Sequence, residues 1–299
     1  MSVKHPVVAI TGSSGAGTTT VKNAFEHIFF RESIKPLVVE GDSFHRYDRA
    51  EMKEAMAKAE AEGNDFFSHF GPEANHFDLI AETFKSYGDT GKCNRRYYIH
   101  SDEEAVEHNE RLGGTSYTAG QFTPWQEIDE DTDLLFYEGL HGGASDDQTD
   151  VSKFVDLLVG VVPIVNLEWI QKIFRDNSQR GYSAEAIVDT ILRRMPDYMN
   201  YITPQFSRTD INFQRVPTVD TSNPFIARDI PTPDESFVVI RFKDLKKFDV
   251  DFIYLLNMIP DSFMSRRNTI VVPGSKMGYA MELIFAPIVH EMIEKSRNG

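Results

Sequence analysis

The sequence has little cysteine, no long apolar run and a shortage of basic residues. Cys93 is the single cysteine among 299 residues, so no disulfide can form within one chain, and a reducing compartment is expected. The longest apolar stretch, Leu157 to Val165, has about half the length of a membrane span and is interrupted by Pro163. The first five residues hold no apolar run of the secretory type. These absences predict a cytoplasmic protein with no membrane partner.

The charge balance narrows the range of partners. The chain has 31 lysines and arginines against 46 acidic residues, which gives a net charge of −15. Because binding to a nucleic-acid backbone needs a basic face, we expect no nucleic-acid partner. A phosphorylated small molecule fits such a chain only where basic residues gather locally. With 41% hydrophobic and 26% charged residues, the composition is that of a globular protein.

Short apolar runs alternate with stretches of helical periodicity. The runs lie at Val7–Ile10, Leu37–Val39, Leu134–Tyr137, Leu157–Val162, Val216–Val219, Phe237–Phe242 and Ile270–Val272. The helical periodicity is clearest at 49–62, 74–86, 167–180, 183–200 and 277–295. Continuous apolar runs are typical of strands buried on both faces, so we predict a doubly wound α/β fold with a mostly parallel sheet flanked by helices. We predict one domain over 1–299, with an insertion over the active face at 63–132 and lid helices at 166–200.

The segment VVAITGSSGAGTTT, residues 7–20, predicts a phosphate-binding loop without its usual lysine. In the pattern G-x-x-x-x-G-K-[ST], Gly12 and Gly17 occupy the glycine positions and Thr19 the position of the magnesium-binding hydroxyl, whereas Thr18 replaces the lysine. A glycine-rich turn between a strand and a helix directs backbone N–H groups at an anion, here the phosphates of ATP. The expected nucleotide-binding residues are Gly12, Ser13, Ser14, Gly15, Ala16, Gly17, Thr18, Thr19 and Thr20. Another part of the chain must then supply the missing cation.

Two acidic residues follow predicted strands that neighbour this loop. Asp42 lies in EGDSFHR and Glu138 in LLFYEG. Ligands of an open parallel sheet bind beyond the carboxyl ends of the strands, which places both carboxylates in the same crevice. We interpret Asp42 as the base that orients an attacking hydroxyl, and Glu138, with Thr19, as the Mg²⁺ site. The alternatives are a turn aspartate and a strand-end glutamate without catalytic roles.

Basic residues come directly after Asp42. The spacing of Asp48 and Glu51 predicts a capping box and hence a helix that starts near Arg49. Arg49 and Lys53 would then lie one turn apart, close to His45. We interpret the three as a site for a phosphate monoester; the alternative is a solvated basic face.

The insertion adds two weaker candidates. Tyr98 and His100, in RRYYIH, are placed to reach a sugar substrate, although surface packing explains them equally well. Four histidines of the insertion lack the spacing of metal ligands, so we expect no structural metal site there; they are His69, His76, His100 and His108.

The stretch 166–195 predicts a basic helical hairpin. Lys172, Arg175 and Arg180 recur along one helix, and Arg193 and Arg194 lie on the next. Such a hairpin would close over a triphosphate, exclude water and bring the cation that the loop lacks. The alternative is an exposed amphipathic hairpin whose cations are solvated.

Together these segments resemble phosphoribulokinases, in their bacterial form. The resemblance rests on GSSGAGTTT (12–20), EGDSFHRYDRAEMK (40–53), LLFYEGLHG (134–142), PIVNLEWIQKIFRD (163–176), RGYS (180–183), ILRRM (191–195) and PQFSRTDINFQRVPTVDTSNPFIAR (204–228). It implies a P-loop kinase of the Calvin cycle that phosphorylates the C1 hydroxyl of D-ribulose 5-phosphate. The bacterial form also has threonine at the lysine position.

The resemblance implies a role for most of these residues. Asp42 would be the base, Glu138 the magnesium-site acid, and His45, Arg49 and Arg180 contacts of the sugar phosphate. Lys172 and Arg175 would stabilise the transferring phosphoryl group, and Arg193 and Arg194 would serve nucleotide binding or regulation. Bacterial members are homo-oligomers activated by NADH, with Arg31, Arg194, Arg241 and Arg266 as candidate effector or interface residues.

Two other readings stay open. A uridine- or pantothenate-type kinase would keep the loop, Asp42 and Glu138 but would not need His45, Arg49 and Lys53. A nucleotide-binding regulatory protein of the same fold would have lost the activity.

Overall fold

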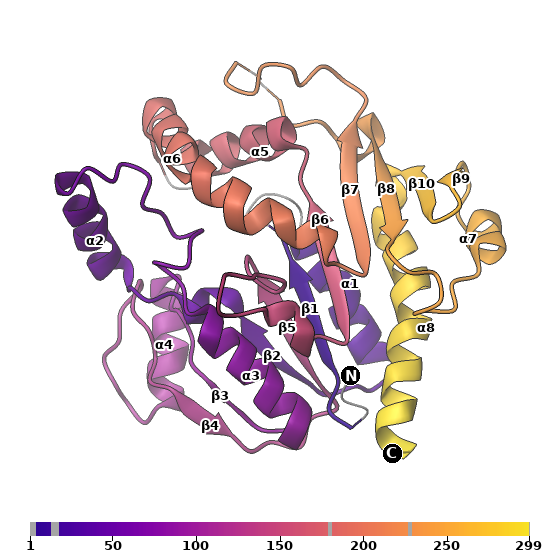
Figure 1. Cartoon of the computed structure of the whole chain (residues 1–299), viewed down its shortest axis with the longest axis horizontal. Coiled ribbons are helices and arrows are strands. Elements are labelled where there is room, and N and C mark those ends of the chain that lie inside the picture. The colour runs from indigo at the N-terminus through magenta and orange to yellow at the C-terminus, as the bar shows by residue number, and fades with distance from the viewer. Residues whose placement is uncertain (1–3, 13–17, 179–180, 227–228, 299) are drawn as a thin grey trace.

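An eight-stranded mixed sheet with helices on both faces forms the centre of the protein (Figure 1). The structure is a computed structural model and describes residues 4–12, 18–178, 181–226 and 229–298. The strands of the large sheet, in spatial order, are β2 (Pro36–Glu40), β5 (Leu134–Gly139), β1 (Val7–Thr11), β6 (Leu157–Val162), β7 (Ile211–Pro217), β8 (Ser236–Phe242), β10 (Thr269–Pro273) and β9 (Phe263–Arg266). The first five run parallel, and the last three extend the sheet in antiparallel pairs. A separate pair consists of β3 (Cys93–Arg95) and β4 (Gln126–Ile128).

The helices alternate with the parallel strands. They are α1 (Thr18–Arg31), α2 (Arg49–Ala61), α3 (Phe77–Thr90), α4 (Asp102–Arg111), α5 (Val165–Ser178), α6 (Ala184–Asp197), α7 (Phe252–Met258) and α8 (Met277–Asn298). The capping box predicted for Asp48 and Glu51 is confirmed, because each side chain accepts a backbone N–H bond at the start of α2. None of the helices that the structure describes is long and apolar enough to cross a membrane.

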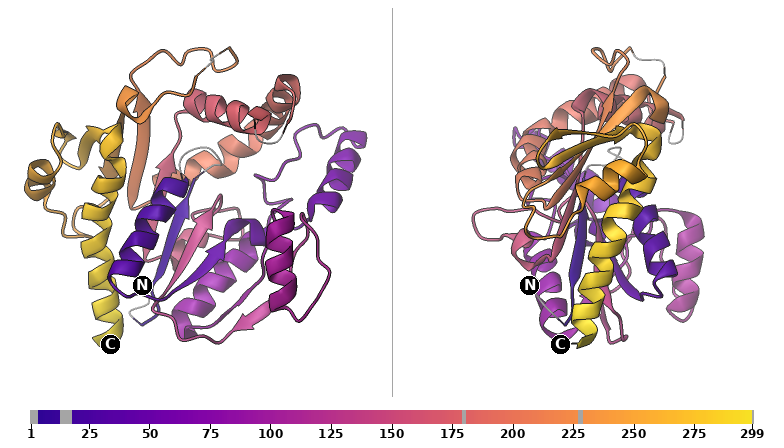
Figure 2. Two further views of the ribbon diagram at one scale, coloured as in Figure 1. Left: turned by 180° about the vertical axis from the view of Figure 1, so that it is seen from behind. Right: turned by 90° about the vertical axis from the view of Figure 1, so that its right-hand side faces the viewer.

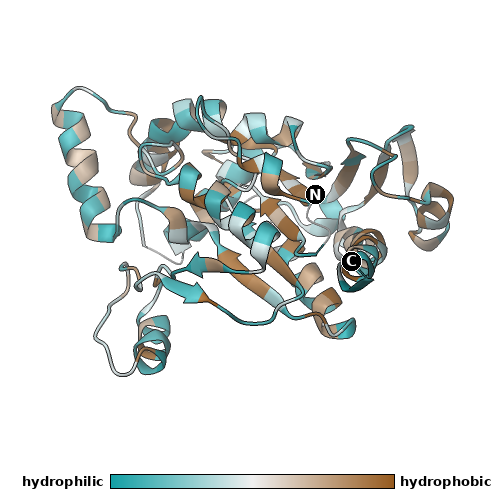
Figure 3. Ribbon diagram, turned by 60° about the horizontal axis from the view of Figure 1, so that its bottom comes forward, coloured by the Kyte–Doolittle hydropathy of each residue, from teal (hydrophilic) through white to brown (hydrophobic). Residues whose placement is uncertain are grey.

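Four of the five parallel strands, β1, β2, β5 and β6, contribute to two hydrophobic cores, whereas β7 contributes to one. Val8 and Ile10 pack with α1 and α8 on one face, and Val7 and Ala9 pack with α3 on the other. Figure 2 shows the same layering from behind and from the side, and Figure 3 shows the apolar strands enclosed by more polar helices. Burial on both faces is the reason that these four strands read as continuous apolar runs.

The predicted α/β class is confirmed, with local corrections. The run predicted at Val216–Val219 is only the end of β7, which begins at Ile211. The sheet is parallel over five strands and antiparallel beyond β7, which continuous apolar character alone does not distinguish. The sequence patterns missed α4, α7, β3, β4 and β9, all of them short elements. Within the predicted insertion, α3 packs into the core through Phe77, Ile80 and Phe84.

The predicted basic hairpin is formed by α5 and α6, which lie across the top of the sheet in Figure 1. Gly181 has φ of +70°, a left-handed conformation that favours glycine, in the turn between the helices. Ser183 then caps α6 by accepting the N–H of Ala186. Because α5 begins directly after the end of β6, the hairpin lies on the side of the sheet where the parallel strands end.

Candidate active site

Glycines let the ends of the central strands approach one another. A Cβ atom on Gly41 would lie 2.8 Å from the Cα of Gly139 and 2.6 Å from the hydroxyl of Tyr137, closer than such atoms pack. A Cβ on Gly12 would lie 3.0 Å from the backbone oxygen of Val161. The ends of β1, β2 and β5 can converge in this way only with glycine at these positions.

Most of the predicted phosphate loop lies outside the described residues. Residues 13–17, with Ser13, Ser14, Gly15, Ala16 and Gly17, lie outside the described residues, as does Arg180. Gly12 closes β1, and its N–H donates to the carbonyl of Gly139 (3.2 Å). Thr18, Thr19 and Thr20 form the first turn of α1; Thr18 is buried and Thr20 exposed, and only the backbone of Thr19 is described.

Glu138 ends β5 beside the start of α1. Burial raises the pKa of its carboxyl group, a hydrogen bond with Thr18 and the charge of Lys22 lower it, and the neighbouring carboxylates Asp42 and Glu40 raise it again. Burial is the largest cause of the net rise in pKa, and a divalent cation bound here would stabilise the ionised carboxylate. No complete cage of three or more His, Cys, Asp or Glu ligands occurs among the described residues. Mg²⁺ fits this arrangement, because it takes one or two carboxylates and keeps water and phosphate oxygens as its other ligands.

Asp42 lies in a short 3-10 turn, Gly41–Phe44, that continues β2. Its carboxylate is met by two imidazoles: His45 Nε2 is 3.3 Å from Oδ1, and His100 Nε2 is 3.8 Å from Oδ2. Burial would raise the pKa of Asp42, but the hydrogen bond and charge of His45, with the charge of His100, hold it well below its usual range. Asp42 is therefore a carboxylate at neutral pH, and its side chain remains 42% exposed.

His45 is fixed on both ring nitrogens. Its Nδ1–H donates to Oδ1 of Asn75 (2.7 Å), and the Asn75 amide donates in turn to the carbonyls of His69 and Gly71, both at 2.8 Å. Burial lowers the pKa of His45, but the bonds to Asp42 and Asn75 outweigh it and raise the pKa overall. The edge of the Tyr98 ring faces the imidazole, with centroids 6.4 Å apart. The raised pKa favours the protonated form of the imidazole next to the Asp42 carboxylate.

Arg96 holds the turn that carries these groups, and the sequence analysis missed it. Its guanidinium donates to the carbonyls of Ser43 (2.7 Å) and His45 (2.6 Å). It lies over the rings of Phe122 and Trp125, at 3.7 and 4.7 Å from their centroids. Charge-assisted bonds and two cation–π contacts together fix the backbone on either side of the Asp42–His45 pair.

The remaining substrate-side candidates divide into two groups. The Arg49 guanidinium donates to the carbonyl of His100 (3.3 Å), so it lies next to the imidazoles. Tyr98 packs edge-on against His100, with ring centroids 5.0 Å apart. Lys53 is exposed one turn further along α2, and no contact in the described part of the chain joins it to the cluster.

On the hairpin, Lys172 is paired within its own helix. Its ammonium bonds Asp176, which also accepts from Arg175 Nε (3.0 Å), and the side chains of Lys172 and Asp176 are only 11% and 5% exposed. Burial and the neighbouring charge of Arg194 lower the pKa of Lys172 to about 8, despite the favourable partner Asp176. Asp176 was missed because an aspartate four residues after a lysine usually indicates a solvated helix pair.

Two adjacent arginines of α6 contact α2 and the segment that follows it. Arg193 forms an ion pair with Glu60 of α2, and Nη2 of Arg194 donates to Nε2 of His69 (2.6 Å). Arg194 also lies over the ring of Phe70, 5.1 Å from its centroid. These contacts join the hairpin to α2 and to the segment that follows it.

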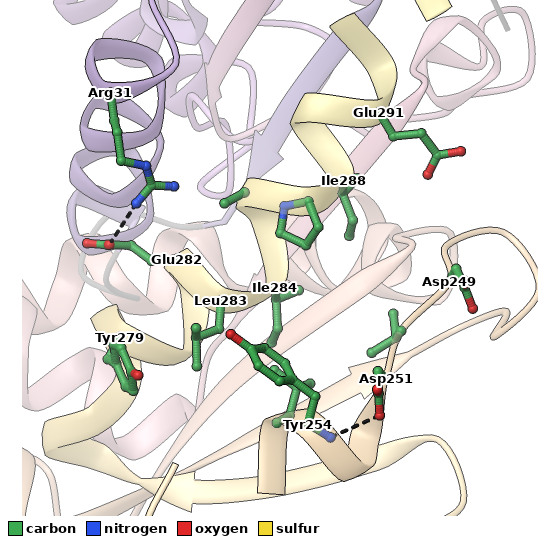
Figure 4. Close-up of a pocket in the computed structure, with 14 residues that line it drawn as sticks. Arg31, Asp249, Asp251, Tyr254, Tyr279, Glu282, Leu283, Ile284, Ile288 and Glu291 are labelled. Atoms are coloured by element: carbon green, nitrogen blue, oxygen red, sulfur yellow. Dashed lines mark hydrogen bonds and ion pairs between the residues drawn. The ribbon is translucent and has the colours of Figure 1, made fainter. Parts of the chain in front are cut away.

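The other three candidate effector residues lie outside this site. Arg31 lines a cavity of about 590 Å³ between α7 and α8, where it faces Glu282 at 3.6 Å (Figure 4). Arg241 and Arg266 are exposed on β8 and β9, both opposite Thr269 of the intervening β10. The two arginines therefore lie on the strands on either side of Thr269, next to a shift in the β9–β10 register.

Comparison with known proteins agrees with this geometry. The sequence pattern of the Phosphoribulokinase / Uridine kinase family matches residues 7–222. The chain belongs to this family. Among curated relatives, the chromosomal phosphoribulokinase of Cupriavidus necator is 61% identical over 100% of this chain and 99% of that protein. The phosphoribulokinase of Nitrobacter vulgaris is 58% identical over 99% of both.

A solved structure extends the likeness within the family to the whole fold. The phosphoribulokinase from Rhodobacter spheroides matches with a TM-score of 0.87 and 49% identity, over 99% of this chain and 100% of that chain. The predicted resemblance and the predicted fold class are therefore confirmed. Family membership does not by itself separate sugar-phosphate from uridine kinases, so the acceptor depends on the site.

Proposed function

We propose that the protein is a phosphoribulokinase, which transfers the γ-phosphoryl group of ATP to the C1 hydroxyl of D-ribulose 5-phosphate. The products are ribulose 1,5-bisphosphate and ADP. The observation that carries the proposal is the Asp42–His45–His100 cluster beyond the end of β2, one of the parallel strands. The full-length relatives that bear this name support the same acceptor.

The ionised Asp42 is suited to hold the attacking hydroxyl. Phosphoryl transfer passes through a loose transition state, so a base mainly orients the nucleophile and takes its proton late. A carboxylate with a lowered pKa is a weak base but a good hydrogen-bond acceptor, which matches that task. Arg49, which is cationic, and His45, whose pKa is raised, are placed next to this group to bind the phosphate of the sugar.

The nucleotide side supplies backbone donors and positive charge. Gly12 and Thr18 flank the loop that would hold the phosphates, and Glu138 with Thr19 would hold Mg²⁺, which neutralises charge on the transferring group. Lys172 and Arg175 would stabilise the equatorial oxygens of that group in place of the loop lysine. Arg193 and Arg180 are proposed nucleotide and sugar-phosphate contacts. Lys53, Tyr98 and His100 complete the proposed sugar side.

The test is an ADP-release assay with ribulose 5-phosphate, uridine and pantothenate as parallel acceptors. We expect turnover with the sugar phosphate alone, because uridine and pantothenate carry no phosphate for the cationic cluster. Turnover with uridine but not with the sugar phosphate would contradict the proposal. ATP binding with no turnover on any acceptor would instead favour a nucleotide-binding regulatory protein.

We further propose a cytoplasmic homo-oligomer of single-domain subunits with NADH as effector. The guanidinium groups of Arg241 and Arg266, on the strands on either side of Thr269, would suit the pyrophosphate of a dinucleotide. Arg31 differs from these two residues, because it already forms ion pairs with Glu32 and Glu282. Arg194 would connect an effector signal to the hairpin. Assays with and without NADH, and sedimentation of the purified protein, test this part.

A further inference from the structure

His69 lies between the two halves of the candidate site, and no role has yet been assigned to it. On one side its ring is 6.0 Å from the ring of His45. On the other side its Nε2 is 2.6 Å from Nη2 of Arg194, which belongs to α6 of the hairpin. The charges of His45, Asp42 and Lys172 all act on it as well. The side chain of His69 thus lies between His45 and the hairpin.

The chemistry of the pair fixes the state of the imidazole. An arginine has only donors, so Nε2 of His69 must accept and the proton of the neutral ring lies on Nδ1. Burial and the neighbouring Arg194 lower the pKa of His69 well below its usual value, which keeps the ring neutral. Protonation would place two cations in contact, and the hydrogen bond would be lost.

The backbone of the same residue is tied to the base. Asn75 donates its amide N–H to the carbonyl of His69 and accepts Nδ1–H of His45. A continuous path of hydrogen bonds therefore runs from Asp42 through His45, Asn75 and His69 to Arg194. Arg193 adds a second contact, an ion pair with Glu60 of α2, so two neighbouring residues of the hairpin are joined to this side of the site.

We propose that His69 is a positioning residue. It holds Arg194 of the hairpin against the part of the chain that carries Asp42 and His45, so that the hairpin closes in the correct position over the bound acceptor. The proposal rests on the proposed kinase function, because the closed hairpin brings Lys172 to the transferring group. It assigns His69 no contact with substrate. Its effect should appear in turnover and in the coupling to Arg194, more than in ATP affinity.

Two nearly isosteric variants separate this role from simple packing. Glutamine at position 69 can place an acceptor oxygen where Nε2 lies, whereas the shorter asparagine places it near Nδ1. We expect His69→Gln to keep kcat within about threefold of the wild type, and His69→Asn to lower it by about tenfold to a hundredfold, the effect of one lost hydrogen bond to a charged donor. The KM for ATP should change less than threefold in both.

A double-mutant cycle then tests the partner. His69→Asn should cost little further turnover in an Arg194→Met background, because the bond is already absent. A matched control is His108→Asn: His108 pairs with Arg111 through Nδ1 at 3.1 Å on α4, outside the candidate site. It should leave kcat unchanged in both backgrounds.

The outcomes distinguish this proposal from the proposed function. If wild-type protein shows no kinase activity on ribulose 5-phosphate, the function fails first. If the wild type is active but His69→Gln and His69→Asn lose kcat equally, or the effects of positions 69 and 194 simply add, the positioning role is overturned. Equal melting temperatures of the two variants would ensure that the comparison reports on the site. If the melting temperatures differ, kcat per folded molecule, from active-site titration with labelled nucleotide, decides in the same way.

Discussion

Replacing Lys172 with methionine tests whether the hairpin supplies the charge that the phosphate loop lacks. In the structure the ammonium is paired with Asp176, and Arg175 also bonds that carboxylate at 3.0 Å, so Asp176 keeps a partner in the variant. Methionine removes a buried charge with a lowered pKa, which makes a large loss of stability unexpected. Removing one group that stabilises the transferring charge costs about a hundred- to a thousandfold in kcat. We expect a loss of that size, with the Kd for ATP within about threefold of the wild type.

The pH dependence gives the same prediction a second measurement. The pKa of Lys172 is lowered to about 8, so the cation is present below pH 8 and is lost as the pH rises through that value. At one unit above the pKa only about a tenth of the lysine is protonated, and kcat/KM should have fallen by about tenfold. Arginine stays protonated throughout this range, so Lys172→Arg should shift the alkaline fall out of it.

The assay is steady-state ADP release with ribulose 5-phosphate, with ATP affinity measured by calorimetry. The matched control is Lys295→Met, because Lys295 forms an i,i+4 ion pair with Glu291 on the exposed face of α8; its kcat should not change. A Lys172→Met variant with kcat within threefold of the wild type would refute the reasoning. So would an alkaline limb near pH 8 that persists unchanged in Lys172→Arg.

Three further substitutions test the substrate side and the strand ends. Asp42→Asn should lower kcat by about a hundred- to ten-thousandfold and leave ATP binding intact, measured by the same two assays; an unchanged rate would remove the assignment of the base. Arg96→Leu leaves two backbone carbonyls without their cationic donor, and urea unfolding should show a loss of about 3–5 kcal/mol together with a lower kcat. Gly41→Ala forces a Cβ against Gly139 and Tyr137 and should destabilise by about 1–3 kcal/mol, whereas Gly278→Ala on α8, which has open space around it, should not destabilise.

The features that the sequence predicted well are local or repeated along the chain. The apolar runs identified four of the five parallel strands because those four are buried on both faces, and the spacing of Asp48 and Glu51 located the start of α2. Asp42 and Glu138 could be placed in one crevice because the ends of parallel strands meet at one edge. No local pattern distinguished the antiparallel strands, whose apolar runs look the same.

The contacts that the sequence did not predict join residues that are far apart in the chain. Arg96 bonds the carbonyl of a residue 51 positions earlier, and Arg194 bonds a side chain 125 positions earlier. Asn75 is an ordinary turn residue until the fold brings it to His45. Spacing rules describe neighbours on one helix or strand, so contacts of this kind become visible only when the topology is known.

The pairing of Lys172 with Asp176 separates two events that a loop lysine would combine. A lysine inside the loop accompanies the phosphates whenever a nucleotide is bound, and so does its charge. Here the nucleotide can be held by backbone donors while the ammonium stays engaged with its own helix. If Lys172 supplies the missing charge as proposed, wasteful transfer of the phosphoryl group to water would require both a bound nucleotide and a hairpin that has released the ammonium from Asp176, so nucleotide binding alone would not expose ATP to hydrolysis.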